Sequence, residues 1–141
     1  MDAQWKRIAA IVGSGEAATF ELQVAAFHEH LLRLLKLPCE VTGIEDFQWE
    51  ERYVFGGGSR AEYERLKKKQ PSYRDRYELV GIEKSVFSEW MLFDEDLGAR
   101  VRRKSDGKEF LLGLSELKAV DGKSENGKLL HDFSVFLVNS R

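Results

Sequence analysis

The carboxylate side chains of this sequence are its clearest candidates for a ligand-binding site. They occur in three short acidic runs, Asp94-Glu95-Asp96, Glu45-Asp46 and Glu50-Glu51. Calcium is a hard cation that takes about six to eight oxygen ligands, mostly from carboxylates, backbone carbonyls and water. A fold that brings the three runs together would supply such a set. The candidate calcium ligands are therefore Asp94, Glu95, Asp96, Glu45, Asp46, Glu50 and Glu51.

The spacing of these acids differs from that of a continuous calcium-binding loop. The Asp-x-Asp-x-Asp-Gly pattern of an EF-hand, with its terminal Glu, is absent. Acidic runs also suit solvated turns, because charged residues normally face water. Calcium binding here therefore requires oxygen ligands from distant parts of the chain to meet around one point.

The other reactive residues do not form a catalytic motif. The sequence has neither the Gly-x-Ser-x-Gly elbow of hydrolases nor a dinucleotide-binding fingerprint. His28 and His30 are two residues apart, so on a helix they cannot form the i, i+4 pair of a zinc site. His131 and Asp132 are adjacent, and adjacent helical residues diverge by about 100°. We expect a protein that is not an enzyme.

Composition limits the class of protein. The chain has 141 residues, 43% of them hydrophobic, which suits a single domain over residues 1–141. We expect a helical segment over residues 1–37 to pack on an α+β core over residues 38–141. The net charge of −2 argues against a dedicated nucleic-acid binder. Cys39 is the only cysteine, and no secretory signal or membrane-spanning run is evident, so we expect a cytoplasmic protein.

Hydrophobic spacing predicts helices near both ends of the chain. The first covers residues 3–12 and the second begins near residue 17 or 19 and ends at residue 36. A short helix over residues 59–69 has Ser59 as its N-cap and Glu62 in a capping box. A last helix follows the polar loop at residues 121–127, although residues 133–138 also have some strand character.

Several short strands are expected between the helices. They cover residues 40–45, 46–55 and 77–82, a strand beginning at Trp90, and a hairpin whose strands flank Asp106-Gly107. Asp-Gly predicts a two-residue type I′ turn, because that turn needs positive φ at both central positions. The fold class is therefore α+β, with a small SH3-like β-barrel or a strongly bent antiparallel sheet, N-terminal helices and a C-terminal helix.

The C-terminal half resembles a known family. Residues 90–103, the stretch from Lys108 to Leu117 and residues 124–139 are similar to the small calcium-binding proteins of the CcbP family. This resemblance implies an SH3-like barrel with flanking helices and calcium as the ligand. It also implies that the three acidic runs supply the ligands. The chain differs from the acidic members of that family in being nearly neutral, and residues 56–71 look like an insertion.

A second hypothesis belongs to another functional class. Trp49, Tyr53 and Phe55 lie close in sequence to Arg52, Arg60 and the basic run at residues 67–69. Exposed aromatic rings and cations together could bind a protein or a nucleic acid, as in an SH3-like adaptor. The alternative for these aromatic residues is that they fill the core.

Overall fold

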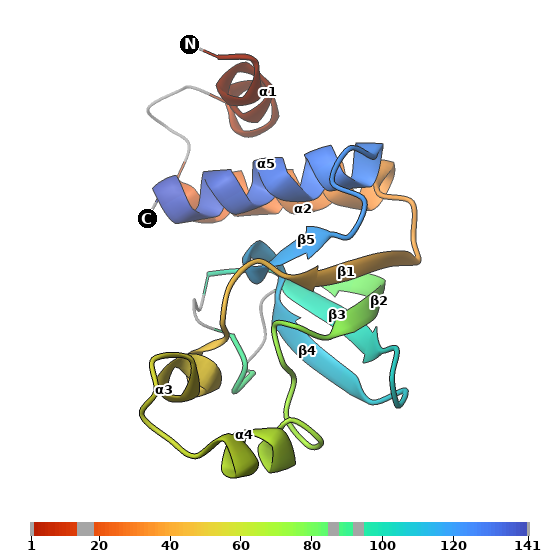
Figure 1. Cartoon of the computed structure of the whole chain (residues 1–141). Helices are drawn as coiled ribbons and strands as arrows, with labels where there is room; N and C mark the ends of the chain where they lie inside the picture. Colours follow the sequence, from red (N-terminus) through yellow and green to blue (C-terminus); the bar gives the residue numbers. More distant parts are fainter. Residues whose placement is uncertain (1, 14–18, 85–87, 92–94, 141) are drawn as a thin grey trace.

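The computed structural model describes residues 2–13, 19–84, 88–91 and 95–140. A layer of helices lies on one side of an antiparallel sheet, and two short helices lie beyond the sheet on the other side (Figure 1). The protein therefore has the expected α+β architecture, with helices from both ends of the chain in one layer.

The sheet is open. Its five strands are β1 (Cys39–Gly43), β2 (Arg76–Glu83), β3 (Gly98–Arg103), β4 (Glu109–Gly113) and β5 (Leu117–Ala119), in the order β4-β3-β2-β1-β5. Every pairing is antiparallel. The two edge strands, β4 and β5, do not pair with each other within the described residues. The antiparallel-sheet alternative is thus confirmed, and the closed SH3-like barrel is wrong.

The hairpin of β3 and β4 has a longer turn than the sequence predicted. Arg103 N donates to Lys108 O at 2.7 Å, and Gly107 N donates to Arg103 O at 2.7 Å. Gly107 has a φ of 78°, but no described residue other than glycine has a positive φ. Asp106 therefore cannot occupy a type I′ position. Its carboxylate instead accepts hydrogen bonds from Lys108 N and from the Arg103 guanidinium.

Three long helices follow the predicted ranges, and each has a side-chain cap. They are α1 (Ala3–Val12), α2 (Phe20–Leu34) and α5 (Glu125–Asn139). Their N-caps are Asp2, Thr19 and Ser124, whose side-chain oxygens accept from backbone N–H groups of the first turn. The strand alternative for residues 133–138 is wrong, because α5 continues through them.

The helices bury an aromatic cluster against the sheet. Phe27 of α2 meets Phe133 and Phe136 of α5 with ring centroids 5.3 and 5.2 Å apart. In Figure 1, α2 and α5 lie side by side, and α1 lies on their outer surface. Arg7 of α1 reaches the buried carboxylate of Asp132 through two hydrogen bonds. One hydrophobic cluster therefore includes residues of the N-terminal helices, the sheet and α5.

The segment between β1 and β2 is helical. The strand predicted over residues 46–55 is wrong: the chain forms a 3₁₀ turn, η1 (Gln48–Glu50), then α3 (Glu51–Val54) and α4 (Arg60–Leu66). Local alternation was a weak strand signal here, and burial of Glu50 among hydrogen-bond donors favours the turn. The strand predicted from Trp90 is not seen either, since Trp90 lies in a turn and residues 92–94 are outside the described ranges.

Arg103 joins α4 to the β3–β4 hairpin. Arg103 is 2% exposed, and its guanidinium donates to the carbonyls of Lys67, Lys68 and Gln70 at 2.8–2.9 Å. It also pairs with Asp75 and Asp106 at 3.0 and 2.8 Å. Carbonyl groups at the C-terminal end of a helix have no hydrogen-bond partner within the helix. The buried Arg103 cation supplies the donors for these carbonyls at the end of α4.

Within the described residues, no helix combines the length and apolar character needed to cross a bilayer.

Candidate metal site

The chain after β1 is held against η2 (Leu114–Glu116). Ile44 N donates to Glu116 O at 2.9 Å, and Gly43 N donates to Tyr73 O at 3.1 Å. Any Cβ at Gly43 would lie 2.6 Å from the Cβ of Tyr73, so only glycine permits this approach. The next two residues, Glu45 and Asp46, are thereby placed beside η2.

Acidic side chains from both segments line one pocket of about 420 Å³, called the acidic pocket below. It is lined by Ile44, Glu45, Asp46, Gln48, Glu51, Phe55, Ser115, Glu116, Ser134 and Val138. Three of the seven predicted calcium ligands therefore share a cavity with a fourth carboxylate, Glu116. Among these described lining residues there is no lysine or arginine, so the negative charge is not offset within the cavity.

The carboxylates at the mouth of the acidic pocket are available. Glu45 and Glu51 are exposed and Asp46 is half-buried. None of these three side chains makes a hydrogen bond or ion pair within the described ranges. Oxygen ligands of this kind suit a hard cation such as calcium. In the described part of the chain, no three histidine, cysteine or acidic side chains are already gathered as a metal cluster, so binding an ion requires these side chains to turn inward.

Asp96 is buried beside the acidic pocket and holds η2. Its carboxylate is 0% exposed and accepts from Ser115 N at 3.2 Å and from Ser115 Oγ at 2.6 Å. A Cβ on Gly113 would meet Asp96 Oδ2 at 2.6 Å and Glu116 Oε2 at 3.0 Å. Gly113 is therefore needed for the two carboxylates to lie close to the backbone at this point.

Glu95, from the same acidic run as Asp96, lies elsewhere. Glu95 is exposed and, with Asp96, lines a different pocket that also contains Lys84 and residues of α2. Asp94 lies outside the described residues. Glu95 therefore does not share a cavity with Glu45, Asp46 and Glu51.

Glu50 has a structural environment. It is 0% exposed, and its Oε1 accepts from Tyr73 N at 2.8 Å and from Phe47 N at 3.3 Å. Its Oε2 accepts from Tyr63 Oη at 2.5 Å and from Ser72 Oγ at 2.7 Å. Four donors from three segments thus surround this carboxylate, and it faces away from solvent although its neighbour Glu51 lines the acidic pocket.

Glu116 is the residue of the acidic pocket that sequence reasoning missed. It lies in the stretch from Lys108 to Leu117, where apolar residues suggested only a strand and a short irregular turn. The signal in the sequence is the polar pair Ser115-Glu116, which interrupts an apolar run and follows Gly113. The sequence pair alone does not show that Glu116 lines a cavity with Glu45 and Asp46, because that depends on the tertiary contact between Ile44 and Glu116.

The aromatic residues of the adaptor hypothesis are mostly packed together. Trp49 donates from Nε1 to Pro71 O at 2.6 Å, and its ring contacts Tyr63. Tyr53 stacks on Tyr63 with centroids 5.3 Å apart. Phe55 is 82% exposed. Two of the three rings therefore belong to a packed aromatic cluster, and Phe55 faces solvent.

Two solved structures share this fold. One, described as the crystal structure of Anabaena CcbP, is 16% identical with a TM-score of 0.57, covering 95% of this chain and 88% of that chain. The other, described as a calcium binding protein in the calcium-binding form, is 15% identical with a TM-score of 0.56, covering 97% and 90%. No family model and no curated protein sequence matches the chain. The CcbP-like fold that the sequence indicated is confirmed.

Proposed function

We propose that this protein binds calcium in the acidic pocket, as a non-enzymatic ion-binding protein. Glu45, Asp46, Glu51 and Glu116 are the proposed side-chain ligands. The single observation that carries the proposal is that carboxylates from two separate segments line one cavity that has no lysine or arginine in its lining. The fold similarity to a protein described as calcium-binding supports the same ion.

The chemistry of the donor set favours calcium over other metals. All the charged donors are carboxylate oxygens, whereas zinc and copper sites in proteins usually include nitrogen or sulfur. Calcium also accepts irregular geometry and variable ligand number, while magnesium demands a near-ideal octahedron. A pocket whose carboxylates must first turn inward therefore suits calcium, and it suits weak binding.

Asp96 has an indirect role in this proposal. By accepting hydrogen bonds from both the N–H and the hydroxyl of Ser115, it fixes the residue that precedes Glu116. Asp96 therefore positions η2 at the wall of the acidic pocket. Glu50 contributes in a similar way, because it holds η1 in place before Glu51.

Calorimetric titration of metal-free protein with calcium tests the proposal. We expect saturable binding with a Kd of about 10⁻⁴ to 10⁻³ M, the range of weak protein sites. The double variant Glu45→Gln/Glu51→Gln should weaken binding by at least about tenfold, since it removes two charged oxygen ligands. Its matched control is Glu29→Gln/Glu89→Gln, which has the same change in charge at two exposed glutamates elsewhere.

Two results would contradict the acidic pocket as the site. One is the absence of binding heat at millimolar calcium. The other is an equal loss of affinity in both double variants, which would show that calcium responds only to net charge. Glu95→Gln measures the predicted contribution of the run at residues 94–96, and we expect it to leave the Kd within about twofold because Glu95 lines a different pocket.

A further inference from the structure

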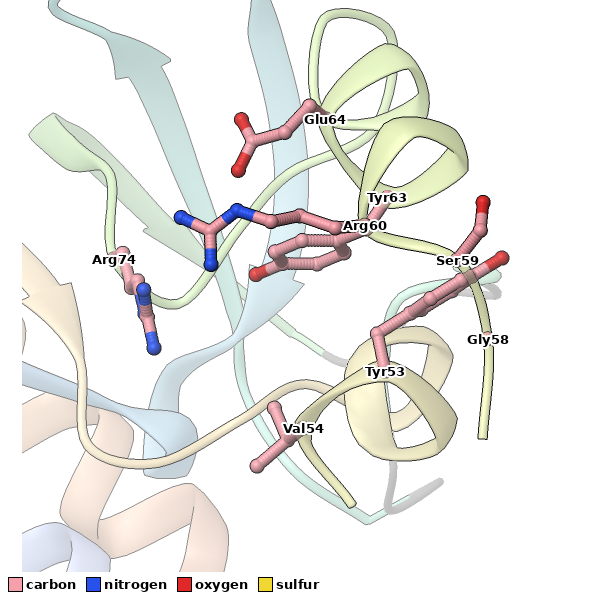
Figure 2. Close-up of a pocket in the computed structure, with 8 residues that line it drawn as sticks. All are labelled: Tyr53, Val54, Gly58, Ser59, Arg60, Tyr63, Glu64 and Arg74. Carbon is pink, nitrogen blue, oxygen red and sulfur yellow. The ribbon is translucent and has the colours of Figure 1, made fainter. Parts of the chain in front are cut away.

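A second pocket, between α3, α4 and the loop before β2, has the opposite charge. It is called the arginine pocket below, has a volume of about 210 Å³ and is lined by Tyr53, Val54, Gly58, Ser59, Arg60, Tyr63, Glu64 and Arg74. Figure 2 shows Arg60 extending from the start of α4 toward the side where Arg74 enters from the loop before β2, with the Tyr63 ring close by. Two guanidinium groups from separate segments therefore line one small cavity.

The arginines of this region lack acidic partners, in contrast to those of the sheet. Arg76, Arg100, Arg102 and Arg103 each pair with a carboxylate. Within the described ranges, neither Arg60 nor Arg74 forms an ion pair. Residues 47–75 contain seven lysines and arginines against five acidic residues, although the whole chain is slightly negative.

The acidic residues near the arginine pocket are already engaged. Glu50 and Glu62 accept hydrogen bonds from the hydroxyls of Tyr63 and Tyr53. Glu64, which lines the pocket, pairs with Lys67 at 3.7 Å. The positive charge of the two arginines is therefore offset only in part by the residues around them.

The donors of the pocket are also held in place. Arg74 donates from Nε to Tyr73 Oη at 3.0 Å and lies over the Tyr73 ring, so its two terminal nitrogens remain free to donate. Ser59 Oγ accepts from Glu62 N, so it caps the helix from which Arg60 extends. Burial and the bond to Glu50 raise the pKa of Tyr63 to about 12, so this wall of the pocket stays uncharged at neutral pH.

We infer that the arginine pocket binds the phosphate group of a phosphate monoester, with Arg60 and Arg74 as the donors to the dianion. Guanidinium forks match the geometry of phosphate oxygens and form strong charge-assisted hydrogen bonds with them. Sites for whole drug-sized ligands usually measure at least about 300 Å³. The smaller arginine pocket therefore fits the phosphate group, with the attached organic group outside.

The probe for the first experiment is inorganic phosphate, added to calcium-free protein at constant ionic strength while backbone amide shifts are followed by NMR. We expect saturable shifts at Arg60 and Arg74. Arg60→Gln and Arg74→Gln should each weaken binding by about tenfold, the effect of losing one charge-assisted hydrogen-bonding group. Arg65→Gln is the matched control, because Arg65 is exposed on the same helix but does not line the pocket.

The control also decides between a site and a general charge effect. If Arg65→Gln weakens phosphate binding as much as Arg60→Gln, or if the shifts map to another surface, the inference is wrong. Circular dichroism of each variant confirms that the helices are intact. Arg60→Lys keeps the charge but removes the fork, and it should bind several-fold more weakly than the parent protein.

Two phosphate monoesters then identify the source of the phosphate. Ribose 5-phosphate represents a phosphorylated metabolite, and a blocked phosphoserine peptide represents a modified protein side chain. Tighter binding of either one than of inorganic phosphate supports the inference and assigns the source. Failure of all three probes to bind at millimolar concentration overturns it, whatever the result of the calcium titration.

Discussion

Replacement of Glu50 by alanine should destabilise the fold strongly. Glu50 was a predicted calcium ligand, but its carboxylate accepts four hydrogen bonds in a buried position. Glu50→Ala removes the acceptor and leaves the donors of Tyr63, Ser72 and Tyr73 without a partner. Ser72 and Tyr63 are themselves buried, so water cannot simply replace the lost oxygens.

The size of the effect follows from these contacts. A hydrogen bond to a charged group contributes about 1.5–3 kcal/mol to stability. The three short bonds, taken at the low end of that range, make about 4.5 kcal/mol the expected loss in free energy of unfolding. This is a large fraction of the roughly 5–15 kcal/mol that stabilises a typical domain. Glu50→Gln keeps one oxygen and the side-chain volume, so it should cost only about 1–2 kcal/mol.

Urea denaturation in the presence of a calcium chelator measures these values. Tryptophan fluorescence is a suitable signal, because Trp49 lies in the aromatic cluster next to Glu50. The control is Glu51→Gln at the adjacent exposed position, which should change the free energy of unfolding by less than about 0.5 kcal/mol. A loss below about 1 kcal/mol for Glu50→Ala would refute the structural role, and an accompanying loss of calcium affinity would restore Glu50 as a ligand.

Three other perturbations test the fold. Arg103→Met should reduce the free energy of unfolding by about 3–5 kcal/mol in urea denaturation, because it leaves buried carbonyls and carboxylates without their cation; a loss below about 1 kcal/mol would contradict this account of how α4 is held. The hydrogen bond from Arg103 lowers the pKa of Asp106 to about 2 from its ordinary 3.8, so the resulting stability is present above about pH 4 and is lost as the pH falls through about 2. Thermal melts across that range should show a shallower decline for Asp106→Asn than for the parent protein, and parallel declines would argue against the pKa shift. Gly127→Ala should destabilise by about 1–3 kcal/mol, although alanine normally favours a helix, because the added Cβ would lie 2.7 Å from the carbonyl oxygens of Asp121 and Gly122; an increase in melting temperature would refute it.

Local patterns in the sequence were sufficient to predict several helices. The ranges of α1, α2 and α5 follow from apolar spacing of three and four and from capping side chains such as Ser124. The short helix after Ser59 was found in the same way. Its capping box is only half formed, because Ser59 accepts from Glu62 N while the Glu62 carboxylate accepts from Tyr53.

Tertiary structure decided the features that depend on contacts between distant residues. Glu50 and Glu51 are adjacent and chemically alike, yet one is buried among four donors and the other lines the acidic pocket. Likewise, Glu116 joins Glu45 and Asp46 only because Ile44 N reaches its carbonyl. A carboxylate is costly to bury unless donors surround it, and those donors come from segments that no local pattern connects. The sequence therefore gives the candidate acidic residues, whereas the fold decides which of their carboxylates line the same cavity.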